Sequence, residues 1–237
     1  MKIEEKMIDL SVVIPNLNEE KTIEICIKKA LNEISRLGIS GEVIISDNGS
    51  TDGSDELAKK AGARVVYCKE KGYGNALKEG IKNAKGKYII MGDADNTYDF
   101  SQLGNFYQKA ISDKNISMVL GSRFKGGIEK GAMPFLHRYI GNPFLTFMLN
   151  LLFKSNISDS QCGLRLFKKE CYDAITFKAL GMEFATEIIV EFIMNNYKIV
   201  EIPTTLSKDD AERKPHLRTF RDGFRILFYL LNRKYMK

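Results

Sequence analysis

An α/β fold built on a mostly parallel sheet is predicted by two features of the sequence. Between residues 9 and 122, short runs rich in Val, Ile or Tyr alternate with stretches of helical periodicity. Each short run is followed by polar or glycine residues, which end a strand. The resulting order, β-α-β-α-β-α-β-α-β, is typical of parallel strands whose connecting helices cover both faces of one sheet.

The individual elements follow from these runs. The first helix is predicted by Ile23, Ile27 and Ile34, which recur on one helix face. Later helices are expected to begin at Ser54, to contain 76–84 and to contain 103–111. Strands are predicted at 10–14, 43–46, 64–67, 88–91 and 118–121.

Residues after 122 are expected to extend the same domain. A loop-rich stretch with several glycines comes first, then an apolar segment, a helix around 183–195, a strand at 198–203 and a basic amphipathic C-terminal helix. No linker rich in Pro, Ser or Gly separates these elements. We therefore predict one domain over 1–237, with parts at 9–122, 123–212 and 213–237.

The composition excludes several classes of protein. The chain has 237 residues, of which 44% are hydrophobic and 28% charged, so a disordered, collagenous or disulfide-stapled chain is not expected. The four cysteines have no C-x-x-C spacing, which argues against a zinc knuckle or a redox pair. Reduced thiols in a cytoplasmic protein are predicted. The cysteines are Cys26, Cys68, Cys162 and Cys171.

The net charge of +6 is concentrated at the C-terminus, because residues 213–237 carry eight Lys or Arg and one acid. The first six residues are charged rather than apolar, so no secretory signal is expected. The longest uncharged run, 139–153, is shorter than the ~20 apolar residues of a spanning helix. The chain is not expected to cross a bilayer by itself.

Candidate site residues follow the predicted strands. Ligands of open parallel sheets bind beyond the carboxyl ends of the strands, where the loops converge. Three of the four loops that carry polar motifs present carboxylates to this edge. The loops contain Pro15, Asn18 and Glu19, then Asp47, then Asp93 and Asp95, and finally Arg123.

Asp93 and Asp95 form the strongest candidate for a metal site. Two carboxylates two residues apart at a strand end can converge on one hard divalent cation, and Mg²⁺ recruits substrate phosphates to complete its shell. A plain polar turn and a glycosidase acid–base pair are the alternatives. The short separation favours a shared cation over two groups that flank a sugar.

The turn Gly72-Tyr73-Gly74 resembles half of a dinucleotide-binding fingerprint. The full fingerprint needs three glycines in the first strand-to-helix turn, but this turn follows the third strand and the first turn has no glycine. A Rossmann dehydrogenase is therefore not expected. Backbone approach to a nucleotide and a plain glycine turn remain the two interpretations.

Five ordered segments carry a family resemblance: 11–20 (SVVIPNLNEE), 45–54 (ISDNGSTDGS), 92–95 (GDAD), 121–123 (GSR) and 159–165 (DSQCGLR). Together they resemble glycosyltransferase family 2 with the GT-A fold. Within that family the chain looks like the branch that transfers mannose or glucose to polyprenyl (dolichyl) phosphate. The resemblance covers about residues 10 to 225.

The resemblance implies a nucleotide-sugar site in 9–122. Asp47 would accept a hydrogen bond from the base. Asp93 and Asp95 would hold Mg²⁺ or Mn²⁺ and, through it, the donor diphosphate. The nucleotide pocket would be lined by Pro15, Asn18 and Glu19.

The resemblance places the acceptor in 123–212. Arg123 would meet a phosphate of the donor or of the lipid, while Asp159, Gly163 and Arg165 match a motif near the acceptor. Two departures stand out. Thr97 occupies a place where relatives often have Gln, so water would replace that ligand. The segments 181–187 and 215–218 look closer to bacterial and archaeal glucosyl-type members.

A phosphate acceptor also agrees with the basic residues. A sugar hydroxyl needs a general base as it attacks, whereas a lipid phosphate is already an anion and needs cations to hold it. The chain has only two histidines, His137 and His216, and is rich in arginine. The residues expected to bind the acceptor are Arg123, Arg138, Asp159, Arg165 and Arg218.

Contact with a membrane surface is predicted for two apolar segments. In the C-terminal helix, Phe220, Phe224 and Phe228 share a stripe flanked by arginines, a pattern typical of interfacial helices. The segment 143–153 is expected to contact a membrane or a second copy, and burial in the core is the alternative for both. Glu183, Glu187 and Glu191 are predicted to form a solvated face, with a place for Glu183 at the site as the alternative.

The sequence thus predicts an inverting, metal-dependent glycosyltransferase at the cytosolic membrane face. It would move a hexose from UDP-glucose or GDP-mannose to polyprenyl phosphate, since Asp47 suits uracil or guanine equally. A transferase for sugar hydroxyls of a polysaccharide or glycolipid and a non-catalytic nucleotide-sugar-binding subunit are the alternatives. A membrane-protein partner or homo-oligomer is possible, and nucleic-acid binding is not expected because the tail's cations interleave with an apolar stripe.

Overall fold

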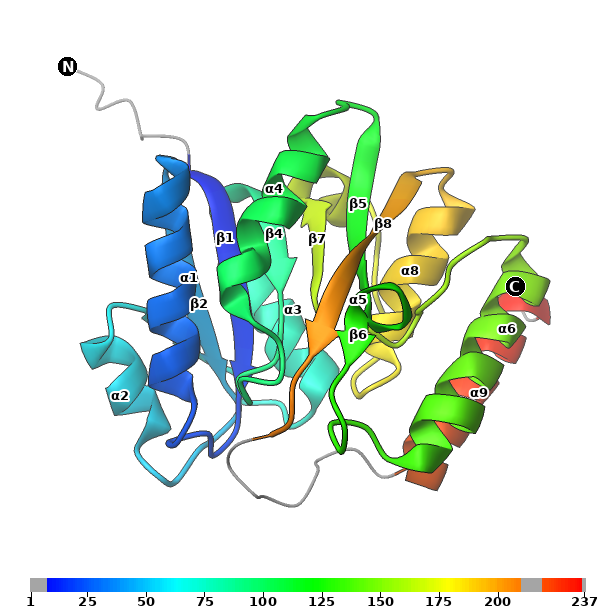
Figure 1. The fold of residues 1–237 in the computed structure, drawn as a ribbon, viewed down its shortest axis with the longest axis horizontal. Coiled ribbons are helices and arrows are strands. Elements are labelled where there is room, and N and C mark those ends of the chain that lie inside the picture. Colours follow the sequence, from blue (N-terminus) through cyan, green and yellow to red (C-terminus); the bar gives the residue numbers. More distant parts are fainter. Residues whose placement is uncertain (1–7, 210–218, 236–237) are drawn as a thin grey trace.

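The computed structural model describes residues 8–209 and 219–235 and shows one eight-stranded sheet (Figure 1). The strand order is β3-β2-β1-β4-β7-β5-β8-β6. The strands are β1 (Ile8–Asn16), β2 (Gly41–Asp47), β3 (Arg64–Tyr67), β4 (Gly86–Met91), β5 (Ile116–Ser122), β6 (Gly127–Ile128), β7 (Arg165–Lys168) and β8 (Lys198–Leu206).

Helices pack on both faces of the sheet. In Figure 1, α1 and α4 lie in front of the strands and α3 lies behind them. The α-helices are α1 (Ile23–Leu37), α2 (Ser54–Lys60), α3 (Tyr73–Asn83), α4 (Leu103–Ile111), α5 (Arg123–Gly126), α6 (Asn142–Phe153), α7 (Lys169–Asp173), α8 (Phe184–Met194) and α9 (Thr219–Tyr235). A short 3₁₀ helix, η1 (Phe100–Gln102), precedes α4, and a π-helical turn, η2 (His137–Gly141), precedes α6.

The predicted mixed α/β architecture is confirmed. All five strands predicted before residue 122 are present, and α1 buries Ile23, Ile27 and Ile34 as its periodicity indicated. It ends at Gly38, whose φ of 65° is a left-handed conformation that favours glycine. The strand predicted at 198–203 is β8, and the predicted C-terminal helix is α9.

Two strands were not predicted, the two-residue β6 and the strand β7, and β7 lies in the middle of the sheet. β7 pairs antiparallel with β4 on one side, where Met91 is opposite Arg165, and antiparallel with β5 on the other, where Leu120 is opposite Arg165. The other pairs in the sheet are parallel. Four residues that begin with a buried arginine carry too weak a strand pattern to be recognised in isolation.

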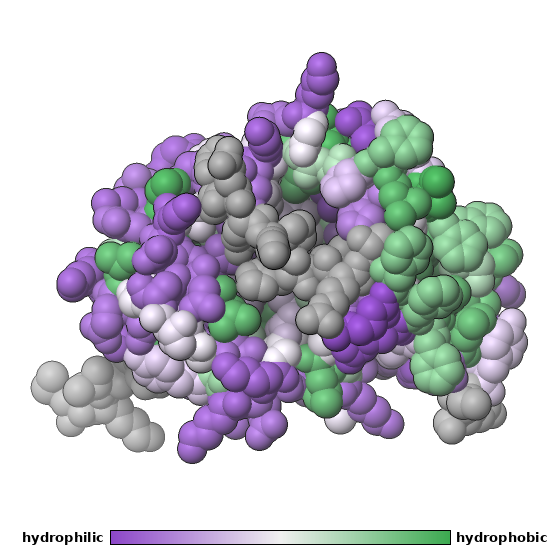
Figure 2. Space-filling model, turned by 90° about the horizontal axis from the view of Figure 1, so that it is seen from below, coloured by the Kyte–Doolittle hydropathy of each residue, from purple (hydrophilic) through white to green (hydrophobic). Residues whose placement is uncertain are grey.

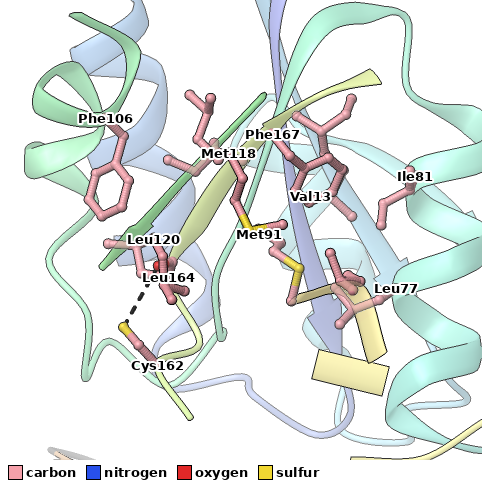
Figure 3. Packing of buried hydrophobic residues seen from close by; sticks show 14 of the residues in the cluster. Val13, Leu77, Ile81, Met91, Phe106, Met118, Leu120, Cys162, Leu164 and Phe167 are labelled. Carbon is pink, nitrogen blue, oxygen red and sulfur yellow. Dashed lines mark hydrogen bonds between the residues drawn. The ribbon is translucent and has the colours of Figure 1, made fainter. Parts of the chain in front are cut away.

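The central strands carry the hydrophobic core. Val13, Met91, Met118 and Phe167 pack together from β1, β4, β5 and β7, as Figure 3 shows, and all four are fully buried. Removing one such side chain from water contributes about 1.5–3 kcal/mol. The strand ends that carry polar residues are therefore fixed by a rigid, well-packed interior. All four cysteines are buried and free of disulfides.

The glutamates on α8 are not solvated, which corrects the prediction. Glu183, Glu187 and Glu191 are only 9%, 3% and 8% exposed, and the backbone N–H groups of Lys178 and Ala179 donate to the Glu187 carboxylate. The Arg225 guanidinium donates to Glu183 at 2.9 Å, and the Arg233 guanidinium donates to both oxygens of Glu191. Regular i, i+4 spacing of acids is typical of a solvated face, but here a second helix supplies the cations.

Helices α6 and α9 form a layer beside the sheet, at the right of Figure 1. Each buries one face and exposes the other: Ile226 and Leu230 of α9 are buried, whereas Phe224 and Phe228 are 68% and 64% exposed. Burial in the core therefore does not account for the stripe on α9. Within the described residues, no helix combines the length and the apolar character that a bilayer crossing requires.

Candidate functional site

The carboxyl ends of the parallel strands form one edge of the sheet, at the bottom of Figure 1. There Asn16, the last residue of β1, is opposite Asp47, the last residue of β2. On the other side of β1, Val13 is opposite Met91, the last residue of β4. The loops after these three strands therefore begin side by side, as expected for a ligand site of a parallel sheet.

Hydrogen bonds join the loops after β1 and β2. Asn16 Nδ2 donates to Asp47 Oδ1 at 2.9 Å, and Thr51 N donates to Asn18 Oδ1 at 2.8 Å. Asn18 has a φ of 59°, a left-handed conformation that asparagine adopts more readily than most residues. The two loops thus form one cross-linked surface.

The residues predicted to line the nucleotide pocket differ in their exposure. Pro15 is partly exposed and Asn18 is exposed, so both present surface to a ligand. Glu19 is only 7% exposed, and its backbone carbonyl accepts hydrogen bonds from Thr22 and Ile23 at the start of α1. That all three residues line a nucleotide pocket stays a prediction. In this structure the backbone carbonyl of Glu19 helps to begin α1.

Asp47 is the centre of its own loop. Its Oδ1 accepts from Asn16 Nδ2 and Ser50 Oγ, and its Oδ2 accepts from Gly49 N at 2.9 Å and Ser50 N at 3.1 Å. These four bonds use the acceptor capacity of a carboxylate. Asp47 therefore shapes the loop in this structure, and a bond from a nucleotide base would have to replace one of the four.

Asp93 and Asp95 lie in the turn after β4. The Tyr73 hydroxyl donates to Asp93 Oδ1 at 2.8 Å, and the Thr97 backbone N–H and hydroxyl both donate to Asp95 Oδ1, at 3.0 and 2.6 Å. Burial, followed by the negative charge of Asp93, raises the pKa of Asp95 to about 6. The two half-buried carboxylates are thus close enough to influence each other's charge, and Thr97 orients that of Asp95.

This pair fits a divalent cation shared with a substrate phosphate. The charge of Asp93 contributes, after burial, to the raised pKa of Asp95, and a cation between the two carboxylates would offset this repulsion. Across 8–209 and 219–235, no group of three or more His, Cys, Asp or Glu side chains is arranged to hold a metal. Two carboxylates are nevertheless typical protein ligation for Mg²⁺, whose remaining ligands are water and phosphate oxygens.

Arg123 and Asp159 form a buried ion pair. Asp159 Oδ2 accepts from Arg123 N at 3.0 Å and Nε at 2.7 Å, and its Oδ1 accepts from Nη2 at 2.7 Å. Arg123 is 7% exposed and Asp159 is fully buried. The two predicted acceptor-side residues therefore lie together, but the charge of Arg123 is already matched, so contact with a phosphate stays a prediction.

A third residue, Glu201 on β8, organises the turn that presents Asp159. Its Oε1 accepts from Ser158 N at 2.9 Å and from Asp159 N at 3.2 Å, and its Oε2 accepts from Lys125 Nζ at 2.7 Å. β8 runs parallel to β5, whose last residue precedes Arg123. The ion pair is therefore held from both sides by the sheet.

Arg165 was predicted to contact the acceptor, and the structure corrects this. The side chain is fully buried, and its guanidinium donates to the carbonyl oxygens of Ala185 and Cys162. Burial lowers its pKa, while the nearby Tyr73 and Asp93 oppose that shift. Arg165 thus supports the floor of the site, and in this structure no part of it is available to an acceptor.

The remaining predicted acceptor residues have different settings. Arg138 is partly buried, with its guanidinium 5.4 Å from the centre of the Tyr139 ring. Burial and the charge of Arg123 lower the pKa of His137, which keeps that imidazole neutral. Arg218 and His216 lie outside the described residues, as do 215–218 as a whole.

Three functional candidates were missed by the sequence. Tyr73 contacts Asp93, Glu201 holds the Asp159 turn, and the Tyr98 hydroxyl accepts from Gly163 N at 2.9 Å. Burial raises the pKa of both tyrosines well above the ordinary value, so both stay protonated. Only the glycines around Tyr73 gave a signal, and they indicated a turn rather than a contact with Asp93.

Sequence and structure comparisons agree with this geometry. The sheet of this order has the GT-A fold of glycosyltransferases. The chain belongs to glycosyl transferase family 2, whose model matches residues 11–176. It is 39% identical over 224 residues to the low-salt glycan biosynthesis hexosyltransferase Agl6 of Haloferax volcanii. That match covers 94% of this chain and 53% of Agl6, so the chain spans about half the length of this relative.

Two further comparisons bear on function and fold. Human dolichyl-phosphate beta-glucosyltransferase is 30% identical over 209 residues, which cover 80% of this chain and 64% of that protein. The crystal structure of glucosyl-3-phosphoglycerate synthase from Mycobacterium tuberculosis with Mn²⁺, UDP and phosphoglyceric acid superposes with a TM-score of 0.73. It is 21% identical, and the match covers 97% of this chain and 79% of that one. This likeness confirms the GT-A fold.

Proposed function

We propose that this chain transfers a hexose from a nucleotide diphosphate sugar to polyprenyl (dolichyl) phosphate. The observation that carries the proposal is the half-buried pair Asp93 and Asp95 at the carboxyl end of β4, beside the loop that Asp47 organises, in a family 2 chain. The relatives support the acceptor, since one is a dolichyl-phosphate glucosyltransferase and another is a hexosyltransferase of glycan biosynthesis.

The cofactor is Mg²⁺ or Mn²⁺, held by Asp93 and Asp95. The neighbouring synthase structure, which contains UDP and Mn²⁺, supports this choice. When bound, such a cation would neutralise charge on the departing diphosphate. The chain's own contribution is to present two carboxylates, one oriented by Tyr73 and one by Thr97. UDP-glucose is the preferred donor to test first, with GDP-mannose as the second.

Transfer requires no general base from the protein. An oxygen of the lipid phosphate attacks the anomeric carbon of the sugar, the bond from that carbon to the diphosphate oxygen breaks, and the nucleoside diphosphate leaves with the electron pair. Direct attack inverts the configuration. The attacking phosphate is an anion at neutral pH, so a neutral His137 is consistent with this chemistry.

Arg138 is the arginine best placed to hold the lipid phosphate. Among the described residues, no carboxylate forms an ion pair with it, whereas Arg123 and Arg225 are paired with Asp159 and Glu183. It lies in η2, immediately before α6, where the apolar surface begins. A phosphate bound by Arg138 would therefore sit at the border between the polar site and the apolar layer.

The apolar layer is proposed to rest on the cytosolic face of a membrane. Figure 2, which views the carboxyl edge of the sheet, shows hydrophobic side chains gathered at the right, on the side where α6 and α9 lie. Cations of α9 such as Arg221 flank this surface and would contribute about 1 kcal/mol each near anionic headgroups. The exposed apolar residues are Phe135, Leu136, Tyr139, Ile140, Phe144, Phe147, Leu151, Phe220, Phe224, Phe228 and Leu231.

The test is a transfer assay with the full chain. Labelled UDP-glucose and GDP-mannose are each offered with polyprenyl phosphate or with free sugar acceptors, with Mn²⁺ or with EDTA. We expect product on the phosphate lipid with one donor, abolished by EDTA. Asp95→Asn should lower kcat by at least about 10²-fold, whereas the control Asp113→Asn, far from the site, should not change it.

Each other result identifies what is wrong. Full activity in EDTA contradicts the metal. Product only on sugar hydroxyls contradicts the lipid acceptor and supports a polysaccharide or glycolipid transferase. Saturable UDP binding without any product supports the non-catalytic alternative.

A further inference from the structure

A tyrosine outside the family motifs contacts one of the two site aspartates. Tyr73 is the first residue of α3, and its hydroxyl donates to Asp93 Oδ1 at 2.8 Å. Asp93 comes from the turn after β4, 20 residues further along the chain. Contact between side chains from two elements requires that α3 begin at a fixed point relative to β4.

The backbone on both sides of Tyr73 fixes that point. Gly72 has a φ of 134°, and a Cβ at this position would lie 2.4 Å from the carbonyl oxygen of Leu180. A Cβ on Gly74 would lie 2.8 Å from Phe184 Cβ. Neither position therefore accommodates a side chain, and the start of α3 is pressed against the segment before α8.

The loop after β2 holds the same turn. Asn48 Oδ1 accepts from Gly72 N at 2.8 Å, and Asn48 Nδ2 donates to the carbonyl oxygen of Glu70 at 2.8 Å. Asn48 is 5% exposed. The position of Tyr73 is thus tied to the loop of Asp47 as well as to α8.

The Asp93 carboxylate is restrained on its second oxygen too. A Cβ built on Gly163 would lie 2.6 Å from Asp93 Oδ2, so this oxygen packs directly against the Gly163 backbone. Gly163 is in turn held by its N–H bond to Tyr98. The carboxylate is therefore held between a hydroxyl donor on Oδ1 and a backbone surface at Oδ2, which limits its rotation.

We infer that Tyr73 is a positioning residue that orients the Asp93 carboxylate for divalent cation binding. This inference rests on the proposed metal role of Asp93 and deepens it. Outer hydrogen bonds to metal-binding side chains commonly change metal affinity by 10–100-fold. Removing the Tyr73 hydroxyl while keeping the ring should therefore lower the affinity for the cation. The loop after β2, which Asp47 organises, should keep its structure.

The experiment compares Tyr73→Phe with the parent chain and with Tyr107→Phe. Tyr107 lies in α4, where its ring packs edge-on against Tyr88. Mn²⁺ binding is measured by electron paramagnetic resonance at saturating UDP, and UDP binding without metal is measured by calorimetry. We expect Tyr73→Phe to weaken Mn²⁺ binding by about tenfold or more. Its affinity for UDP without metal should stay within about twofold of the parent. Both affinities should be unchanged in Tyr107→Phe.

Several outcomes would overturn the inference. If a folded Tyr73→Phe variant binds Mn²⁺ with the affinity of the parent, the inference is wrong, but the proposed metal site is not affected. Equal losses of Mn²⁺ and metal-free UDP affinity would show a general structural effect instead. If the parent chain itself binds no Mn²⁺ in the presence of UDP, the metal role of Asp93 fails and the inference fails with it.

Discussion

Removal of the Asp159 carboxylate tests the buried ion pair most directly. Asp159→Ala would leave the side chain of Arg123, a residue that is 7% exposed, inside the protein. The guanidinium would lose two hydrogen bonds and the Arg123 backbone N–H would lose a third. Breaking such a pair from one side costs about 3–5 kcal/mol, because the remaining charge is desolvated and unmatched. For a chain of this size that corresponds to a fall in Tm of about 6–20 °C.

The assay is urea unfolding followed by circular dichroism, with thermal melts as a second readout. The matched control is Asp173→Ala, which removes an exposed i, i+4 partner of Lys169 and should cost no more than about 0.5 kcal/mol. The double variant Arg123→Met/Asp159→Leu should recover most of the loss, since no buried charge remains. A cost below about 1 kcal/mol for Asp159→Ala would refute this account of the pair.

Three further predictions concern other parts of the site and surface. The Asp95 carboxyl has a pKa of about 6 in the fold against an ordinary 3.8, so ionising it in metal-free protein opposes folding as the pH rises from about 4 to 6. In EDTA, Asp95→Asn should therefore be more stable than the parent above pH 6 by roughly 2–3 kcal/mol, and a pH-independent difference would contradict this. Gly163→Ala should weaken Mn²⁺ binding by about tenfold or more, whereas Gly223→Ala should not, because a Cβ at Gly223 would meet no other group within 4 Å. Phe224→Glu and Phe228→Glu should each weaken sedimentation with anionic vesicles by about tenfold while changing the free energy of unfolding by less than about 0.5 kcal/mol. Vesicle binding equal to the parent would show that α9 does not rest on the membrane.

The sheet up to residue 122 could be predicted because each strand there is a short apolar run between helices of clear periodicity. The same logic placed Asp47, Asp93 and Arg123 at one edge, since parallel strands bring their carboxyl ends together. The roles of Asp47 and Arg123 were harder to predict from the sequence. Whether a carboxylate or a guanidinium faces a ligand or its own loop depends on partners 3 to 36 residues away.

The misses have one physical cause, which is that burial depends on what packs against an element. Glu183 and Glu191 are acids at helical spacing, and only the arrival of α9 encloses them. Arg165 is the largest of the fully buried side chains, although arginine is seldom found inside a protein. Tyr73 is in a glycine turn whose sequence gives no indication of the aspartate it reaches.

The position of β7 has a consequence for how the chain can be divided. β4 and β5 are close in sequence but are not neighbours in the sheet, because a four-residue segment from 43 residues beyond β5 separates them. A fragment that stopped at residue 122 would leave the inner edges of both strands unpaired, and unpaired edges promote aggregation. Chain closure across that distance must precede completion of the sheet, so we expect slow folding and poor tolerance of circular permutation between β5 and β7.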